Sequence, residues 1–162
     1  MSKKVYVAFY YGGGSFIDKM IQWWTSPFKN KWNNKWKSAA SHCELSFGSN
    51  KWYSASTRMP MEFRVKIMAL NPGKWRVYEL PITEDDYKRM SQTALSFIGK
   101  KYDWLNIFGS DILHLGIHDA DKLTCDEGCA RILNQSGFYL DLGGIPMLNP
   151  TILEQYVKGK VK

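Results

Sequence analysis

The chain has 162 residues, of which 44% are hydrophobic and 23% charged, so it can bury one proper core but not two comfortable ones. Its 22 Lys and Arg outnumber its 15 Asp and Glu and give a net charge of +7, which favours anionic partners such as nucleic acid, a membrane surface or an acidic cell-wall polymer. Its three cysteines are an odd and sparse set, which argues against a disulfide framework, and no segment reaches the roughly 20 apolar residues of a membrane span. We therefore expect a single domain over residues 1–162.

The N-terminal stretch MSKKVYVAFYYGGG raises the question of a signal peptide, since basic residues precede a short apolar run. The run stops at three glycines, and no small-residue cleavage site follows it. The stretch therefore predicts a buried strand over residues 5–11, and we expect a cytoplasmic protein with reduced thiols. Ser15 is placed to cap a short helix after the glycines.

The stretch SHCELSFGSNKWYSAS, residues 41–56, is the clearest hairpin signal in the chain. Two alternating runs flank Gly48, Ser49 and Asn50, which are turn-forming residues. Two further strands are predicted over residues 61–69 and 75–80, separated by the turn residues Asn-Pro-Gly.

The hydrophobic period then changes to that of helices. Thr83 caps a helix that ends at Gly99, Thr124 begins another that extends to Gln135, and Asn149-Pro150 opens a last one. Strands followed by helices predict an α+β fold, in which an antiparallel sheet of about five strands packs against helices.

Cys125 follows Thr124, and Glu127 completes the S/T-x-x-E pattern of a capping box. Cys125 would then occupy the first helical position, where unpaired amides and the positive end of the helix dipole favour a thiolate. Asp126 and Glu127 oppose this effect. Cys129, one turn further, aligns with the apolar stripe and is expected in the core.

A thiolate nucleophile needs a base that a third group orients. Alternation in the hairpin puts His42 and Glu44 on one face, and Cys43 and Leu45 on the opposite face. Because Leu45 must face the core, His42 and Glu44 are expected to face outward or into a cleft.

Two other interpretations remain open. His114, His118, Cys125 and Cys129 have the spacing H-x3-H-x6-C-x3-C, which fits a zinc site. Alternatively, the basic stretch with stacking aromatics fits a non-catalytic module that binds nucleic acid or a membrane. Its residues are Lys29, Lys31, Trp32, Lys35, Trp36 and Lys37.

Several segments together resemble a known family. SHCELSFGSNKWYSAS resembles the His-bearing hairpin of NlpC-type papain-fold cysteine peptidases and of lecithin:retinol acyltransferase-like enzymes. GKKYDWLNIFG, followed by TCDEGCARIL, resembles the corresponding segments of the circularly permuted YiiX/YebB-like branch. In that branch the His hairpin precedes the Cys helix, as it does here.

The resemblance implies a permuted papain-like fold with Cys125 as nucleophile, His42 as base and no cofactor. The third member in the family usually lies on the strand after the His. Here that position is Ser54, with Glu44 as the alternative, and Tyr102 is expected to line the site.

The implied activity is that of a cysteine hydrolase or acyltransferase that forms an acyl-enzyme. The implied substrates are a peptidoglycan peptide or a lipid-derived ester or amide, besides the anionic polymers that the charge favours. Without a signal peptide, a phage-encoded protein released by lysis or carried in a virion would also reach the cell wall.

Overall fold

The structure is a computed structural model that describes residues 3–26, 38–103, 121–137 and 148–161. These residues form a five-stranded antiparallel sheet and four helices, so the fold is α+β, as the sequence predicts. Within the described ranges, no helix is both long and apolar enough to cross a membrane.

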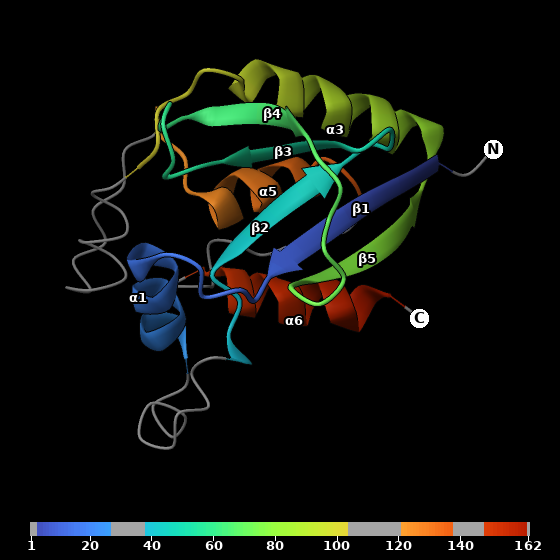
Figure 1. The fold of residues 1–162 in the computed structure, drawn as a ribbon. Helices are drawn as coiled ribbons and strands as arrows, with labels where there is room; N and C mark the ends of the chain where they lie inside the picture. The colour runs from blue at the N-terminus through green and yellow to red at the C-terminus, as the bar shows by residue number, and fades with distance from the viewer. Residues whose placement is uncertain (1–2, 27–37, 104–120, 138–147, 162) are drawn as a thin grey trace.

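The sheet has the strand order β4-β3-β2-β1-β5, with every neighbouring pair antiparallel (Figure 1). Its strands are β1 (Lys3–Tyr10), β2 (His42–Ser46), β3 (Lys51–Ala55), β4 (Phe63–Ile67) and β5 (Trp75–Ile82). In the register of the three strands β2, β1 and β5, Tyr10 pairs with His42 on one side and with Trp75 on the other. These three residues therefore form one row across the end of the sheet.

The predicted hairpin is present, and its turn explains the choice of residues. Gly48, Ser49 and Asn50 all have positive φ, at 105°, 59° and 55°. That conformation costs little for Gly and is tolerated by Asn, as expected for a tight connection between twisted strands. The predicted strand over 61–69 is shorter in the structure, where β4 contains only Phe63–Ile67. Residues 61–62 belong to the connection from β3, and residues 68–69 to the connection to β5.

The helices are α1 (Phe16–Thr25), α3 (Glu84–Phe97), α5 (Cys125–Leu133) and α6 (Pro150–Lys160). Each starts directly after the predicted capping residue, whose side chain accepts a hydrogen bond from a first-turn amide. These capping residues are Ser15, Thr83, Thr124 and Asn149. The first residue of each of these helices is therefore set by local chemistry.

Three of these helices pack against the sheet: α5 contacts β2 and β3, α3 contacts β1, and α6 contacts β1 and β5 (Figure 1). The core between them contains alternate strand residues such as Val7, Phe9, Cys43 and Leu45, which are fully buried. This is the face that alternation assigned to the core. The packing brings the start of α5 to β2, the strand that begins with His42.

Candidate functional site

The first residue of α5 is Cys125, as the capping pattern predicts. Thr124 Oγ1 accepts a hydrogen bond from the Glu127 amide at 3.4 Å, and the Thr124 carbonyl accepts one from Gly128 at 3.0 Å. The Cys125 side chain is 3% exposed, whereas Cys129 is fully buried in the core. Both thiols are therefore buried, and Cys125 is the one at the start of the helix.

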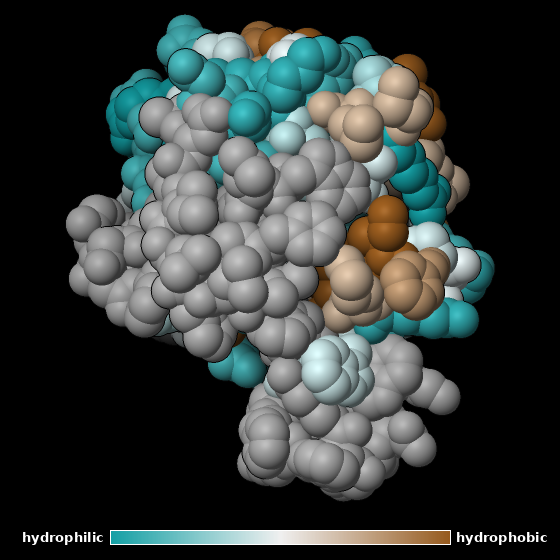
Figure 2. All heavy atoms as spheres, turned by 90° about the vertical axis from the view of Figure 1, so that its left-hand side faces the viewer, coloured by the Kyte–Doolittle hydropathy of each residue, from teal (hydrophilic) through white to brown (hydrophobic). Residues whose placement is uncertain are grey.

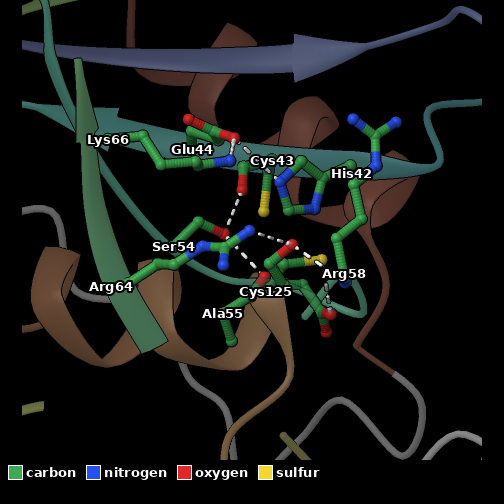
Figure 3. A network of polar contacts seen from close by, with 11 residues as sticks. His42, Cys43, Glu44, Ser54, Ala55, Arg58, Arg64, Lys66 and Cys125 are labelled. Carbon is green, nitrogen blue, oxygen red and sulfur yellow. Dashed lines mark hydrogen bonds and ion pairs between the residues drawn. The ribbon is translucent and has the colours of Figure 1, made fainter. Parts of the chain in front are cut away.

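His42 and Glu44 lie together on the face of β2 that points away from the core. His42 Nε2 is 3.0 Å from Glu44 Oε1, and Lys66 of β4 forms an ion pair with the same carboxylate oxygen. Figure 3 shows the Glu44 carboxylate between the Lys66 ammonium and the His42 ring. Side chains two apart on a strand point in parallel, so these two meet by bending toward each other.

Glu44 is 1% exposed, so its charge depends on these partners. Burial by itself would raise the pKa of Glu44, but the hydrogen bond and charge of His42, followed by the charge of Lys66, lower it below its ordinary value. The carboxylate therefore stays ionised and can hold a protonated imidazole.

His42 also interacts with Cys125. Burial would lower the pKa of His42, but the charge of Cys125 and a hydrogen bond to it, and then the contacts with Glu44, raise that pKa to about 10. Because Nε2 is bonded to Glu44, the interaction with the thiol is assigned to Nδ1. Figure 3 shows the His42 ring between Glu44 and Cys125.

The pKa of Cys125 is lowered well below its ordinary value. The largest cause is a side-chain hydrogen bond from Cys43; burial opposes it, and the charge of His42 and a hydrogen bond to that ring add to the lowering. The pKa of Cys43 is raised by its own burial and by its contacts with Cys125 and Cys129. The contact between the two residues therefore favours the thiol form of Cys43 and the thiolate form of Cys125.

Cys43 is a site residue that the sequence analysis does not single out, because alternation places it with Leu45 on the core face of the hairpin. The alternation of the hairpin contains the information that could identify Cys43 as a site residue. Cys43 lies on the core face of β2, and α5 packs on that face. A thiol at the start of α5 is therefore brought to Cys43 by the packing that buries both.

Two acidic side chains, Asp126 and Glu127, lie in the first turn of α5, as the sequence predicts. Glu127 forms an ion pair with Arg131 at 2.7 Å, which partly neutralises its charge. Asp126 Oδ1 is 3.7 Å from the Cys125 sulfur. This carboxylate can accept from the thiol and repels the thiolate, so it works against His42 and Cys43.

The Ser54 hydroxyl bonds to backbone, whereas Tyr102 lies in the pocket beside His42. The Ser54 hydroxyl donates to the Cys43 carbonyl at 2.7 Å and to the Ala55 carbonyl at 3.1 Å, so it supports the backbone of β2. Tyr102 is 5% exposed and lines a pocket beside His42. Of the candidates for the third member, the structure brings Glu44 to the His42 ring.

The pocket has a volume of about 210 Å³, and its described lining includes His42, Glu44, Lys66 and Tyr102. Cys125 is not part of that described lining, so the pocket borders the His42 ring and not the thiol itself. Figure 2 shows the side of the molecule that carries α1 in Figure 1. On this side, hydrophobic residues (brown) lie next to hydrophilic residues (teal).

The two other interpretations depend on residues outside the described ranges. His114 and His118 of the zinc pattern lie there, as do Lys29 to Lys37 of the basic and aromatic stretch. Among the described residues, no group of three His, Cys, Asp or Glu side chains is arranged to hold a metal ion.

The described site is therefore a thiol with a lowered pKa, an imidazole with a raised one and a buried carboxylate that orients the imidazole. This combination fits nucleophilic chemistry. Comparison of the chain with protein-family models, with curated proteins and with solved structures gave no match.

Proposed function

We propose that the protein is a cysteine hydrolase or acyltransferase with Cys125 as nucleophile, His42 as acid and base, and Glu44 as the residue that orients His42. The observation that carries this proposal is the chain of contacts from Cys125 through His42 to Glu44. A nucleophile, a base and an orienting group in sequence are what covalent catalysis by a thiol requires.

The proposed reaction begins with the Cys125 thiolate and the His42 imidazolium. The sulfur attacks the carbonyl carbon of an amide or ester, and the first-turn amides of α5 stabilise the oxyanion. The C–N or C–O bond then breaks, and His42 donates its proton to the leaving amine or alcohol. Water or another acceptor attacks the resulting thioester, gives a proton to His42 and releases the acid or the transferred acyl group together with the thiolate.

The family resemblance of the sequence supports the same proposal. A Cys at the start of a helix that packs on an antiparallel sheet, with its His at the start of a strand, agrees with a permuted papain-like domain. Cell-wall peptide amides and lipid-derived esters or amides are the proposed substrate classes.

Alkylation by iodoacetamide across pH tests the nucleophile without a known substrate. We expect Cys125 to be the fastest-reacting of the three thiols, with a pKa below the ordinary value of about 8.5. His42→Ala should slow its reaction at neutral pH, because the thiolate loses its cationic partner. Peptide mapping by mass spectrometry identifies which cysteine is modified.

Cys125→Ala and Cys129→Ala form a matched pair of variants, since the two thiols are one helical turn apart. We expect Cys125→Ala to abolish the fast alkylation and to lower the rate of hydrolysis of p-nitrophenyl acetate, peptidoglycan fragments or lipid esters by about 10³-fold or more. Cys129→Ala should keep both properties. Equal reactivity of Cys125 and Cys129 in the native protein would contradict the proposal.

A further inference from the structure

The pocket beside His42 has an aromatic wall formed by the row across the end of the sheet. The Tyr10 and Trp75 rings are 5.0 Å apart, and the His42 and Trp75 rings are 6.3 Å apart in an edge contact. The connection from β3 to β4 supplies other lining residues, among them Thr57 and Arg58. The pocket is therefore bounded by flat apolar surface and by a cation.

Among the described residues, Arg58 is the cation of this pocket that has no ion-pair partner. Its side chain is exposed, and among the described residues its guanidinium has no hydrogen-bond or ion-pair partner, whereas its backbone amide donates to Ser56 Oγ at 3.2 Å. Figure 3 shows its side chain reaching up beside the His42 ring.

The other charged groups in the described lining each have an ion-pair or hydrogen-bond partner. Lys66 is paired with Glu44, and the Asp18 carboxylate accepts from the Ser15 amide at 3.1 Å as part of the cap of α1. With His42 protonated, the three cations His42, Lys66 and Arg58 outnumber the two carboxylates Glu44 and Asp18, so a ligand that enters the pocket meets an excess positive charge. The guanidinium offers paired donors in the geometry that carboxylates and phosphates accept.

Ser41 is the second observation. It lines the same pocket, is 2% exposed, and its hydroxyl has no hydrogen-bond partner among the described residues. A buried hydroxyl without a partner is unfavourable, and such groups in native proteins usually have one. A polar ligand atom in the pocket would satisfy it.

We propose that this pocket binds an anionic group of the acyl donor, a carboxylate or a phosphate, with Arg58 as its ion-pair partner and Ser41 as a further donor. The inference rests on the proposed function, because the pocket borders the imidazole that would act on that donor. Its volume of about 210 Å³ is smaller than a typical drug-sized site, so it suits one small charged residue or headgroup rather than a whole acyl chain. The Trp75 and Tyr10 rings would pack against the neighbouring part of the donor.

Alkylation of Cys125 by iodoacetate and by iodoacetamide tests the proposal. In both reactions the thiolate attacks the CH₂ carbon and iodide leaves, and the reagents have nearly the same size but differ in charge. The ratio of the two rates therefore reports recognition of the anion, separately from the reactivity of the thiolate. We expect Arg58→Gln to lower this ratio by about tenfold, as loss of one ion pair would.

Lys88→Gln is the matched control, because it removes one positive charge from an exposed position on α3, away from the pocket. It should leave the ratio unchanged, and Arg58→Lys should give an intermediate value because Lys keeps the charge without the paired donors. A ratio that is the same in Arg58→Gln and in the native protein would overturn the proposal.

Glutarate and inorganic phosphate, added as competitors of iodoacetate, distinguish the two sources of the anion. Protection by either, lost in Arg58→Gln, supports the proposal, and the stronger competitor identifies the chemistry. Protection by neither contradicts it. If Cys125 is unreactive, the proposed function fails. The anion site can then still be tested by calorimetry, which measures direct binding of the same two anions to the Cys125→Ser protein with and without Arg58→Gln.

Discussion

At the scale of single residues, the site depends on what holds the His42 ring. Glu44 is bonded to the ring at 3.0 Å, whereas Ser54 donates to the backbone of β2. A buried carboxylate does more than orient an imidazole, because its charge favours the protonated ring. Glu44 and Ser54 should therefore differ in their effect on the titration of His42, apart from any effect on stability.

We expect Glu44→Gln to lower the pKa of His42 from about 10 toward its ordinary value, because the amide can keep a hydrogen bond but not the charge. The alkaline limb of the kcat/KM profile should move to lower pH, and kcat/KM at neutral pH should fall by about 10- to 100-fold. NMR titration of the histidine rings measures the pKa directly, since the chain has three histidines.

Ser54→Ala is the comparison variant. It removes a hydroxyl that contacts the backbone, so it should leave the titration of His42 in place even where it lowers the free energy of unfolding. An unchanged His42 titration in Glu44→Gln, or a shifted one in Ser54→Ala, would assign the third member differently.

At the scale of elements, the position of Cys125 depends on how closely α5 approaches the sheet. Gly128 lies in α5, and a Cβ atom placed on it would be 2.9 Å from a ring carbon of Phe63 on β4. Phe63 is fully buried and packs edge-on against Phe97 of α3, at 5.6 Å between ring centroids. The ring has little room to move, so the glycine sets the distance between helix and strand.

Gly128→Ala should therefore destabilise the protein by about 1 to 3 kcal/mol through overpacking, although Ala is the better helix former. Gly159→Ala in α6 is the matched control, since a Cβ there meets nothing within 4 Å. It should be stabilising by about 0.5 kcal/mol, less than in a helix centre because the position is near the helix end. Urea unfolding of the two variants measures both, and two changes of the same sign would contradict this account of the packing.

At the scale of the whole molecule, a polar cluster joins the C-terminal helix to the sheet. Glu154 of α6 accepts hydrogen bonds from Tyr11 and from Tyr78, the latter at 2.8 Å, and Arg76 lies 3.8 Å away. The cluster links the end of β1, strand β5 and helix α6. Burial raises the pKa of Glu154 to about 7, and the charge of Lys158 opposes this rise.

The raised pKa makes overall stability depend on pH. Because the folded protein binds this proton more tightly than the unfolded chain, the contribution is complete below the unfolded pKa of about 4.3. It is lost as pH rises through about 7. We expect the free energy of unfolding to fall by about 2 to 3 kcal/mol between pH 5 and 8 from this group, and Glu154→Gln to remove that slope. Urea unfolding at the two pH values measures it, and an equal slope in the variant would refute the assignment.

Much of the fold could be predicted because its signals are local. Ser15, Thr83, Thr124 and Asn149 cap helices by bonding amides three residues or less away, so a short window of sequence contains the whole interaction. Alternation in the hairpin likewise separates His42 and Glu44 from the core face. The predicted zinc ligands His114 and His118 lie outside the described residues.

The sequence by itself determined the class of fold, the strands and helices and the place of Cys125 at the start of a helix. Only the tertiary structure decided which groups meet there. Lys66 reaches Glu44 from another strand, Cys43 reaches Cys125 because α5 packs on the core face of β2, and Arg58 comes beside His42 from the β3–β4 connection. Caps and alternation depend on neighbours along the chain, whereas these contacts depend on sheet order and helix packing, which bring together residues that no local pattern relates.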